Sequence, residues 1–370
     1  MTRDLTLIAA LASILVGWLA WQTIADDPDP VRLQASGLLS AEPDEFKRVT
    51  GPAPLEFPAD HGLHPGYRNE WWYFTGNLDT EVGPVGFQFT LFRFALDPGP
   101  AFDSAWHGEA VWMAHLAVSD GSSKTFYQSE RFARGAARLA GADAERWWLR
   151  DWQVLATNSG WRLEADAGDV AVELEMERLK PFVLQGEVGY SQKGPEPGNA
   201  SRYYSATRLT ADGRIRLDGQ WRSAIGTAWL DREWGSSQLS DDLAGWDWFA
   251  LQLDDGRELM VYRLRRHDGS PSPYSAGVVV AKDGNPTHLN VDDFTTSERR
   301  WWRDHEGHRW PVEWQISVPE AELKLRVEPL FDQQRWDGSI IYWEGAMRVL
   351  DAGSGKPLGR GYLELSGYAD

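Results

Sequence analysis

The densest group of residues with acid–base potential lies at residues 229–234, which read Trp-Leu-Asp-Arg-Glu-Trp. If this segment is a β-strand, Asp231 and Glu233 share a face with Trp229, because side chains alternate along a strand. Arg232 then points to the opposite face. Burial and a neighbouring like charge both raise a carboxyl pKa, which makes a neutral acid available near neutral pH. The alternative is an ion-pair network of these charged residues at a seam between domains.

A third carboxyl, Asp247, lies between two tryptophans in the segment Gly-Trp-Asp-Trp-Phe that begins at Gly245. Strand parity places Asp247 on an apolar face with Phe249 and Leu251, so we expect it to be buried. It is then either a functional acid or the structural partner of a nearby arginine, Arg263 or Arg265. A buried acid is what alkene hydration requires, because the alkene must first be protonated. Of the three carboxyls, Asp247 is the preferred catalytic candidate.

Aromatic residues are abundant, with 21 tryptophans in 370 residues. They either line a pocket for an apolar ligand or close a packed core and stack on arginines. His115 shares a face with Val111, Met113 and Ala117, and is either a core residue or a base that lines the pocket. The candidate ligand-binding residues are Trp71, Trp72, Tyr73, His115, Trp229, Trp234, Trp246, Trp248 and Tyr262.

Several kinds of chemistry lack their motifs in this sequence. The chain has no cysteine, and the segment from His305 to His308 is one residue shorter than the zincin pattern His-Glu-x-x-His. There is no Gly-x-Ser-x-Gly elbow, phosphate-binding loop or dinucleotide fingerprint. We therefore predict no metal and no cofactor. A net charge of −18 opposes binding to nucleic acid, which needs clustered Lys and Arg.

The coarse pattern of the chain is that of β-structure. Residues 87–94, 171–177 and 322–327 alternate between apolar and polar side chains, as half-buried strands do. Asp-Gly pairs that favour hairpin turns recur along the chain. A similarity in sequence between residues 70–74 and 245–249 suggests an internal duplication. Together these features predict an all-β protein of antiparallel sandwiches or closed barrels.

The N-terminus has the pattern of an export signal. Residues 5–21 are apolar and uncharged and follow Arg3. We read residues 1–25 as a signal peptide or membrane anchor and residues 26–60 as a linker. The remainder of the chain is then expected in the periplasm or another extracytoplasmic location, exported by this signal or anchored by it to the inner membrane.

Several islands of sequence resemble one known family. These islands are residues 69–78, 180–186, 200–205, 226–235, 245–249, 342–345 and 361–368. In this order they resemble the AttH-like and carotenoid 1,2-hydratase (CrtC-type) family. The resemblance implies two lipocalin-like, calycin-type antiparallel β-barrel domains, which we place at residues 61–236 and 237–370. It also implies genes that often lie beside transport machinery.

The family shares a fold more securely than a reaction, so three functions remain open. The first is an exported protein that binds a hydrophobic small molecule or lipid, with an inner-membrane transporter complex as a further partner. The second is a hydro-lyase similar to carotenoid 1,2-hydratase, which adds water to an isoprenoid alkene through a buried carboxylic acid. The third is a secreted hydrolase with paired carboxylates.

Overall fold

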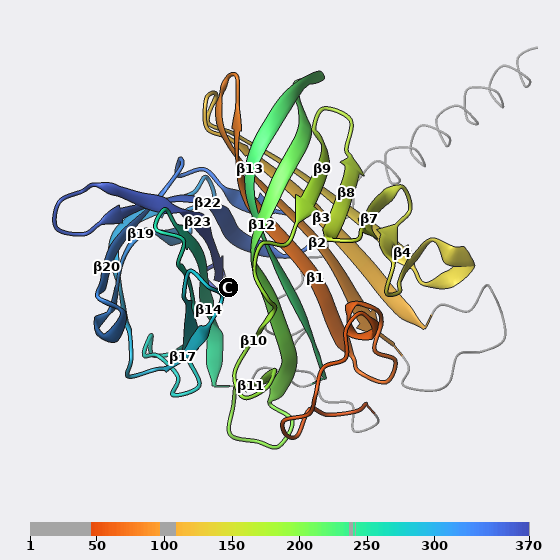
Figure 1. Ribbon diagram of the computed structural model, residues 1–370, viewed down its shortest axis with the longest axis horizontal. Coiled ribbons are helices and arrows are strands. Elements are labelled where there is room, and N and C mark those ends of the chain that lie inside the picture. The colour runs from red at the N-terminus through yellow and green to blue at the C-terminus, as the bar shows by residue number, and fades with distance from the viewer. Residues whose placement is uncertain (1–45, 97–108, 237–239, 241, 370) are drawn as a thin grey trace, which may run out of the picture.

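The computed structural model describes residues 46–96, 109–236, 240 and 242–369. Two curled antiparallel sheets make up this part of the chain, which confirms the predicted all-β fold (Figure 1). Its helical elements are three single 3₁₀ turns, η1 (Ala59–His61), η2 (Ala136–Arg138) and η3 (Pro319–Ala321). No helix among the described residues has the length and apolar character needed to span a bilayer. The predicted signal or anchor, residues 1–25, lies outside the described residues.

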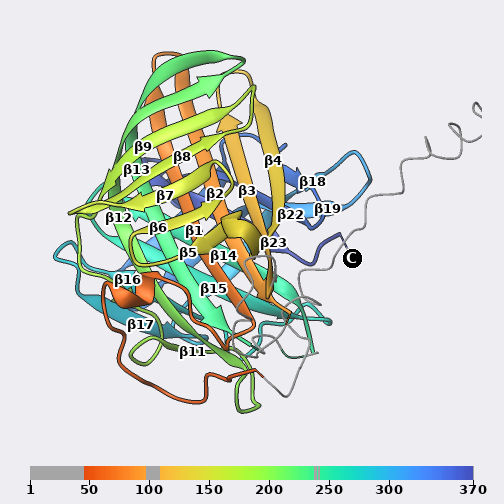
Figure 2. The ribbon, with the colours of Figure 1, turned by 90° about the vertical axis from the view of Figure 1, so that its right-hand side faces the viewer.

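The first sheet has 13 strands and is built from the N-terminal part of the chain. Its order is β4 (Thr125–Arg134), β3 (Ala110–Asp120), β2 (Gly83–Ala95), β1 (Asn69–Thr80), β13 (Gln220–Gly235), β12 (Ala200–Leu217), β9 (Ala171–Glu177), β8 (Gly160–Asp166), β7 (Trp152–Ala156), β6 (Arg146–Leu149) and β5 (Ala140–Ala142). Two short strands, β10 (Val183–Leu184) and β11 (Tyr190–Gln192), pair with β12. Figure 2 shows β6 to β9 lying across β1 to β3, so the sheet curls back over its inner face.

The second sheet has ten strands from the C-terminal part of the chain. Its order is β17 (Pro286–Asn290), β16 (Ala276–Val280), β15 (Glu258–Arg266), β14 (Leu243–Leu253), β23 (Pro357–Ser366), β22 (Ile341–Asp351), β20 (Leu323–Pro329), β19 (Arg309–Val318) and β18 (Thr295–Arg303). The short strand β21 (Arg335–Asp337) pairs with β22. The first sheet ends at Gly235 and the second begins at Leu243.

Both sheets have the same strand connectivity. In each, the first and last long strands are neighbours near the middle of the strand order: β1 with β13, and β14 with β23. The edge strands come from the middle of each segment, β4 and β5 in one and β17 and β18 in the other. Strands β1 and β14, which carry the two segments that echo each other in sequence, therefore hold equivalent places. This agreement supports an internal duplication.

Strand parity separates the two faces of each sheet. On β1 the inner face carries Trp72 and Phe74, which belong to the apolar core enclosed by the first sheet. On β14 the inner face carries Phe249 and Leu251, which belong to the core of the second sheet. Both interiors are filled with tryptophan, leucine and valine side chains. A further apolar cluster lies between the sheets and includes side chains from both outer faces.

Candidate functional site

A cavity lies at the seam between the two sheets, and we call it the seam cavity. Its empty volume is about 1080 Å³, which includes space open to solvent. Its walls come from the outer faces of both sheets and not from either barrel interior. The side chains that line it are Trp71, Tyr73, Thr90, Phe92, Phe94, His115, Lys193, Tyr203, Asp231, Glu233, Trp246, Trp248, Tyr262, Leu264, Ile340, Tyr342, Glu344, Glu364 and Ser366.

The first sheet contributes two rows of cross-strand neighbours to this wall. One row runs from Asp231 on β13 through Tyr73 on β1 and Thr90 on β2 to His115 on β3. The adjacent row comprises Tyr203, Glu233, Trp71 and Phe92 in the same direction across the sheet. On each shared strand the two rows are two residues apart, so both rows point to the outer face. The antiparallel register therefore brings together residues more than 100 positions apart in the sequence.

The second sheet contributes a matching row to the opposite wall. Tyr262 on β15 is the neighbour of Trp248 on β14, which is the neighbour of Glu364 on β23. Glu364 in turn lies directly opposite Glu344 on β22. Two carboxyls at directly opposed positions of an antiparallel pair repel each other when both are ionised. The register of β22 and β23 thus places two carboxyls where their simultaneous ionisation is unfavourable.

Asp231 is a buried acid at the centre of the first wall. Its carboxylate accepts hydrogen bonds from the Tyr203 hydroxyl at 2.5 Å, from the Trp229 indole Nε1 at 2.8 Å and from the Ser205 hydroxyl. Burial outweighs these three donors and raises the pKa of Asp231 to about 7, with a smaller contribution from the charge of Glu233. Asp231 can therefore exchange a proton near neutral pH.

Glu344 and Glu364 are also buried acids. Burial raises the pKa of Glu364 to about 7, although the Trp246 indole Nε1 donates to its Oε1 at 2.9 Å. Burial and the charge of Glu364 raise the pKa of Glu344 well above its usual value. The hydroxyl of Tyr73 donates to Glu344 across the seam, from the first sheet to the second. The cavity therefore contains three carboxyls that burial favours in the neutral form.

Lys193 and Glu233 supply an ion pair to the same cavity. Lys193 Nζ lies 2.8 Å from Glu233 Oε1, and both side chains are nearly buried. The ammonium also lies over the rings of Tyr262 and Tyr203, at 4.8 and 5.3 Å from their centroids. Burial opposes the charged form of Lys193, but the attraction of Glu233 together with the contributions of Tyr262 and Asp231 outweighs it and raises the pKa.

His115 combines the two roles that the sequence left open. It is fully buried and lines the cavity, and its ring stacks on Trp336 with centroids 4.1 Å apart. Its Nε2 lies 3.0 Å from Glu130 Oε1, and its Nδ1 lies 2.8 Å from the Tyr342 hydroxyl oxygen. Burial lowers the pKa of His115, against the opposing effect of Glu130. The imidazole is therefore neutral near neutral pH.

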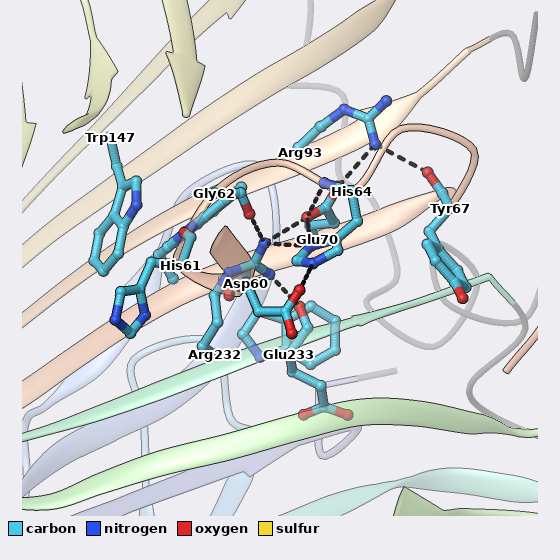
Figure 3. Close-up of polar contacts among 12 residues, drawn as sticks. Asp60, His61, Gly62, His64, Tyr67, Glu70, Arg93, Trp147, Arg232 and Glu233 are labelled. Carbon is cyan, nitrogen blue, oxygen red and sulfur yellow. Dashed lines mark hydrogen bonds and ion pairs between the residues drawn. The ribbon is translucent and has the colours of Figure 1, made fainter. Parts of the chain in front are cut away.

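Behind the first wall, a charged cluster faces the inside of the first sheet (Figure 3). Arg232 Nη2 donates to Glu70 Oε2 at 2.5 Å and to the carbonyl oxygen of Gly62 at 2.5 Å. Arg93 Nη1 lies 3.2 Å from Glu70 Oε1, and the backbone N–H of His64 also donates to this carboxylate. Figure 3 shows Arg232 and Glu233 pointing to opposite sides of their strand. The cluster ties the segment that precedes β1 to the barrel wall.

Asp247 belongs to a corresponding cluster inside the second sheet. Its Oδ2 accepts from Arg263 Nε at 2.6 Å, and its Oδ1 accepts from Arg265 Nη1 and from the Tyr368 hydroxyl at 2.8 Å each. Its burial on the face of Phe249 and Leu251 agrees with the parity argument. The structure does not bring Asp247 to the seam cavity, because inward and outward faces lie on opposite sides of β14.

The other candidate residues divide between the cavity and the protein interior. Asp231, Glu233, Trp71, Tyr73, His115, Trp246, Trp248 and Tyr262 line the seam cavity. Three tryptophans do not line it. Trp72 packs inside the first sheet beneath the Arg232 guanidinium, and Trp234 stacks on His64 with centroids 3.8 Å apart. Trp229 belongs to the apolar cluster between the sheets and donates its indole N–H to Asp231.

Sequence reasoning missed seven polar residues of the site, which are Thr90, Lys193, Tyr203, Tyr342, Glu344, Glu364 and Ser366. The sequence does indicate which face of the sheet the two glutamates occupy. Glu344 follows Trp343, and Glu364 lies between Leu363 and Leu365, and these three apolar residues face inward. Parity alone puts these glutamates on the outer face. Nothing local in the sequence shows that a second sheet covers that face.

Within the described part of the chain, no group of three or more His, Asp or Glu side chains is arranged to hold a metal ion. The polar groups of the cavity are instead suited to hydrogen bonding and proton exchange. Their arrangement allows acid–base chemistry on a ligand held between aromatic rings.

Comparisons with solved structures agree with this architecture. A candidate AttH protein from Nitrosomonas europaea is 34% identical with a TM-score of 0.79, over 87% of this chain and all of that one. Kievitone hydratase from Nectria haematococca is 13% identical with a TM-score of 0.60, over 87% of this chain and 98% of its own. CghA, solved with Sch210972, is 14% identical with a TM-score of 0.50, over 90% and 97% of the two chains.

Sequence comparisons give the same result at the level of the family. No curated protein sequence matches the chain. The model of one family, described as AttH-like, matches residues 48–368 and so spans both sheets. The resemblance inferred from the sequence islands is thereby confirmed, and the chain belongs to the AttH-like family.

Proposed function

We propose that this protein binds a largely apolar small molecule in the seam cavity. The observation that supports this most is the composition of the cavity wall, where the rings of Trp71, Trp246 and Trp248 surround a few polar groups. Ligand pockets commonly have this composition, with apolar walls for affinity and a few polar atoms for orientation. Both barrel interiors are filled by their own side chains, which supports the seam cavity as the binding site.

Tryptophan fluorescence tests this proposal. Isoprenoids, fatty acids and phospholipids are titrated into the full chain, and we expect saturable quenching by the class that binds. Trp246→Phe should reduce the amplitude of quenching, because Trp246 lines the cavity. Trp221→Phe is the matched control, since Trp221 lies on β13 outside the cavity and is 36% exposed. A flat titration with all three ligand classes would refute the proposal.

A second function, hydration of an alkene, is supported by the three carboxyls in the cavity whose pKa is raised by burial. In this reaction a carboxylic acid of Asp231, Glu344 or Glu364 gives its proton to one alkene carbon, and a C–H bond forms. The aromatic rings stabilise the carbocation at the other carbon. Water adds there and loses a proton to a carboxylate, so the acid is restored overall. One distant structural neighbour is named as a hydratase, which is consistent with this proposal.

Hydration is tested by incubating the protein with isoprenoid alkenes in ¹⁸O-labelled water and analysing the products by mass spectrometry. The expected product contains one added water with the label on oxygen. Asp231→Asn should reduce turnover by at least about tenfold, or roughly 1.4 kcal/mol, if Asp231 is the acid. If the alkenes bind but no labelled product forms, the binding function is retained and hydration of the alkenes tested is excluded.

We also propose that the protein works outside the cytoplasm, on the basis of the apolar run at residues 5–21. A carrier at that location is suited to transfer its ligand to an inner-membrane transporter complex. Protease added to intact spheroplasts should digest the chain from Asp26 onward. Full protection from the protease would refute this location.

A further inference from the structure

The seam cavity already holds one ammonium group, that of Lys193. Two tyrosine rings face this ammonium, and Glu233 neutralises it at 2.8 Å. Aromatic faces together with a carboxylate are the groups by which proteins bind substituted ammonium ions. The Lys193 ammonium thus shows how the cavity accommodates a buried cation.

A second set of aromatic rings and carboxyls in the same cavity is not paired with a cationic side chain of the described residues. Trp248 on β14 is the cross-strand neighbour of Glu364, which lies opposite Glu344. The indole N–H of Trp246 donates to the carboxyl of Glu364. Among the described residues, Glu344 and Glu364 form hydrogen bonds with tyrosine and tryptophan donors but no ion pair with lysine, arginine or histidine.

The other charged and titratable groups around these two glutamates do not supply the missing positive charge. Lys193 is already paired with Glu233, and His115 is neutral because burial lowers its pKa. Asp231 adds a further carboxyl from the first sheet. The remaining titratable groups are phenols, those of Tyr73, Tyr203, Tyr262, Tyr342 and Tyr362. Ionisation of the buried carboxyls would therefore leave the cavity with an excess of negative charge.

We propose that the seam cavity takes an organic cation, a substituted ammonium carried on an apolar body. The ammonium lies against Trp246 and Trp248, with Glu364 and Glu344 as its counter-ions. The apolar body extends toward Trp71 and Phe92 on the first sheet. This inference rests on the proposed function, ligand binding in the seam cavity, and adds the charge of the ligand to it.

The proposal predicts a distinctive dependence on pH. Burial raises the pKa of Glu364 to about 7, so a bound cation favours loss of its proton. The affinity for a permanent cation should then rise between about pH 6 and pH 8, by up to about tenfold per pH unit for each proton released. An uncharged ligand of the same shape favours the protonated carboxyls, so its affinity should stay constant or fall over this range.

A matched pair of probes tests this directly. Benzyltrimethylammonium and neopentylbenzene have the same shape and differ in the central atom, a charged nitrogen in one and a neutral carbon in the other. Calorimetric titration of the full chain should show binding of the cation at least about tenfold tighter than binding of the hydrocarbon at pH 8. The affinity for the cation should decrease at pH 6.

Variants locate the effect in the cavity. Glu364→Gln keeps an oxygen that accepts from Trp246 but cannot ionise, so the preference for the cation should fall by at least about tenfold and lose its pH dependence. Glu320→Gln is the control, because Glu320 is exposed at η3. A thermal melt checks that each variant is folded. If Glu364→Gln fails to fold, Glu344→Gln and the pH dependence of the unmodified protein decide the question.

The outcomes separate this inference from the function on which it rests. Binding of the cation with the expected pH dependence supports both. Binding of neopentylbenzene with no preference for the cation overturns the inference and leaves the proposed function standing. If neither probe binds at millimolar concentration, while the isoprenoids, fatty acids and phospholipids also give no quenching, both are overturned. Equal affinity of the Glu364→Gln variant and the unmodified protein for the cation also overturns the inference.

Discussion

The barrel interiors and the seam between the sheets both contain buried carboxyls, but with different partners. Glu70 and Asp247 lie inside the sheets, and each is held by two arginines. Asp231, Glu344 and Glu364 lie at the seam, where their partners are hydroxyl and indole groups. Burial is similar in both regions. The presence of a paired cation, and not depth alone, therefore distinguishes a structural carboxylate from an acid that is available for chemistry.

The pKa values follow this difference in pairing. Burial acts to raise the pKa of Glu70, but the interactions with Arg232, His64 and Arg93 together outweigh it, and the pKa is lowered. At the seam, burial is not offset in this way, and the pKa of Asp231 rises to about 7. Groups of the second kind are the better candidates for function. The following predictions test this distinction, from the largest expected effect to the smallest.

Trp71 and Trp72 are adjacent in the chain but face the seam and the barrel interior, respectively. Trp72→Ala should reduce the free energy of unfolding by about 3–5 kcal/mol, because Trp72 is fully buried in the core. Trp71→Ala should cost much less stability and should weaken ligand binding by at least about tenfold. Urea unfolding and ligand titration of both variants test this. Equal losses of stability would contradict the separation of the two faces.

Asp247→Asn removes one partner of a buried cluster with two arginines. We expect a loss of about 3–5 kcal/mol in the free energy of unfolding, because Arg263 and Arg265 lose their shared carboxylate. Ligand affinity of the folded variant should be unchanged, since Asp247 lies outside the cavity. Chemical denaturation gives the first quantity and fluorescence titration the second. Unchanged stability together with weakened binding would assign Asp247 to the functional site.

Asp231→Asn should change how stability depends on pH. The pKa of Asp231 is raised in the folded state from 3.8 to about 7, so the folded protein binds this proton more tightly than the unfolded chain. The resulting stability is present below about pH 4 and is lost as pH rises toward 7, by up to about 1.4 kcal/mol per unit. Between pH 5 and pH 8 the variant should therefore gain roughly 2.5 kcal/mol relative to the unmodified protein. Denaturation at both pH values measures this, and parallel changes in the two proteins would argue against a raised pKa.

The smallest effect is expected for an exposed ion pair between the sheets. Arg360 on β23 makes two hydrogen bonds to Asp79 on β1, at 2.8 and 2.9 Å, but the Asp79 side chain is 64% exposed. Arg360→Gln should cost less than about 1 kcal/mol in the free energy of unfolding, because solvent screens such pairs. Unfolding at low and high salt checks this. A loss comparable to that of Asp247→Asn would mean that surface charges hold the sheets together.

The extent of single strands, and the face of the strand that each side chain occupies, could be predicted well from the sequence. Residues 87–94 lie in β2, residues 171–177 form β9, and most of residues 322–327 lie in β20. Asp231 and Glu233 do share a face with Trp229, and Asp247 is buried with Phe249. These results follow from the two-residue repeat of a strand, which is local.

The assembly of the site could not be predicted in this way. Glu364 and Glu344 become neighbours through the register of β22 and β23, and Lys193 enters from the segment that follows β11. The sequence also does not show which outer faces meet. For that reason the sequence points to Asp247, on an apolar strand face, and gives no indication of Glu364, whose face becomes buried only when the two sheets pack together.

The central pairing of first and last strands has a consequence for the order in which this molecule can assemble. Strand β14 begins at Leu243, but its neighbour β23 ends at Ser366, so their hydrogen bonds join segments about a hundred residues apart. Contacts between such distant segments are slow to form, because a long loop must close first. Since β23 also carries Glu364, a growing or truncated chain lacks this part of the cavity until its last strand is in place.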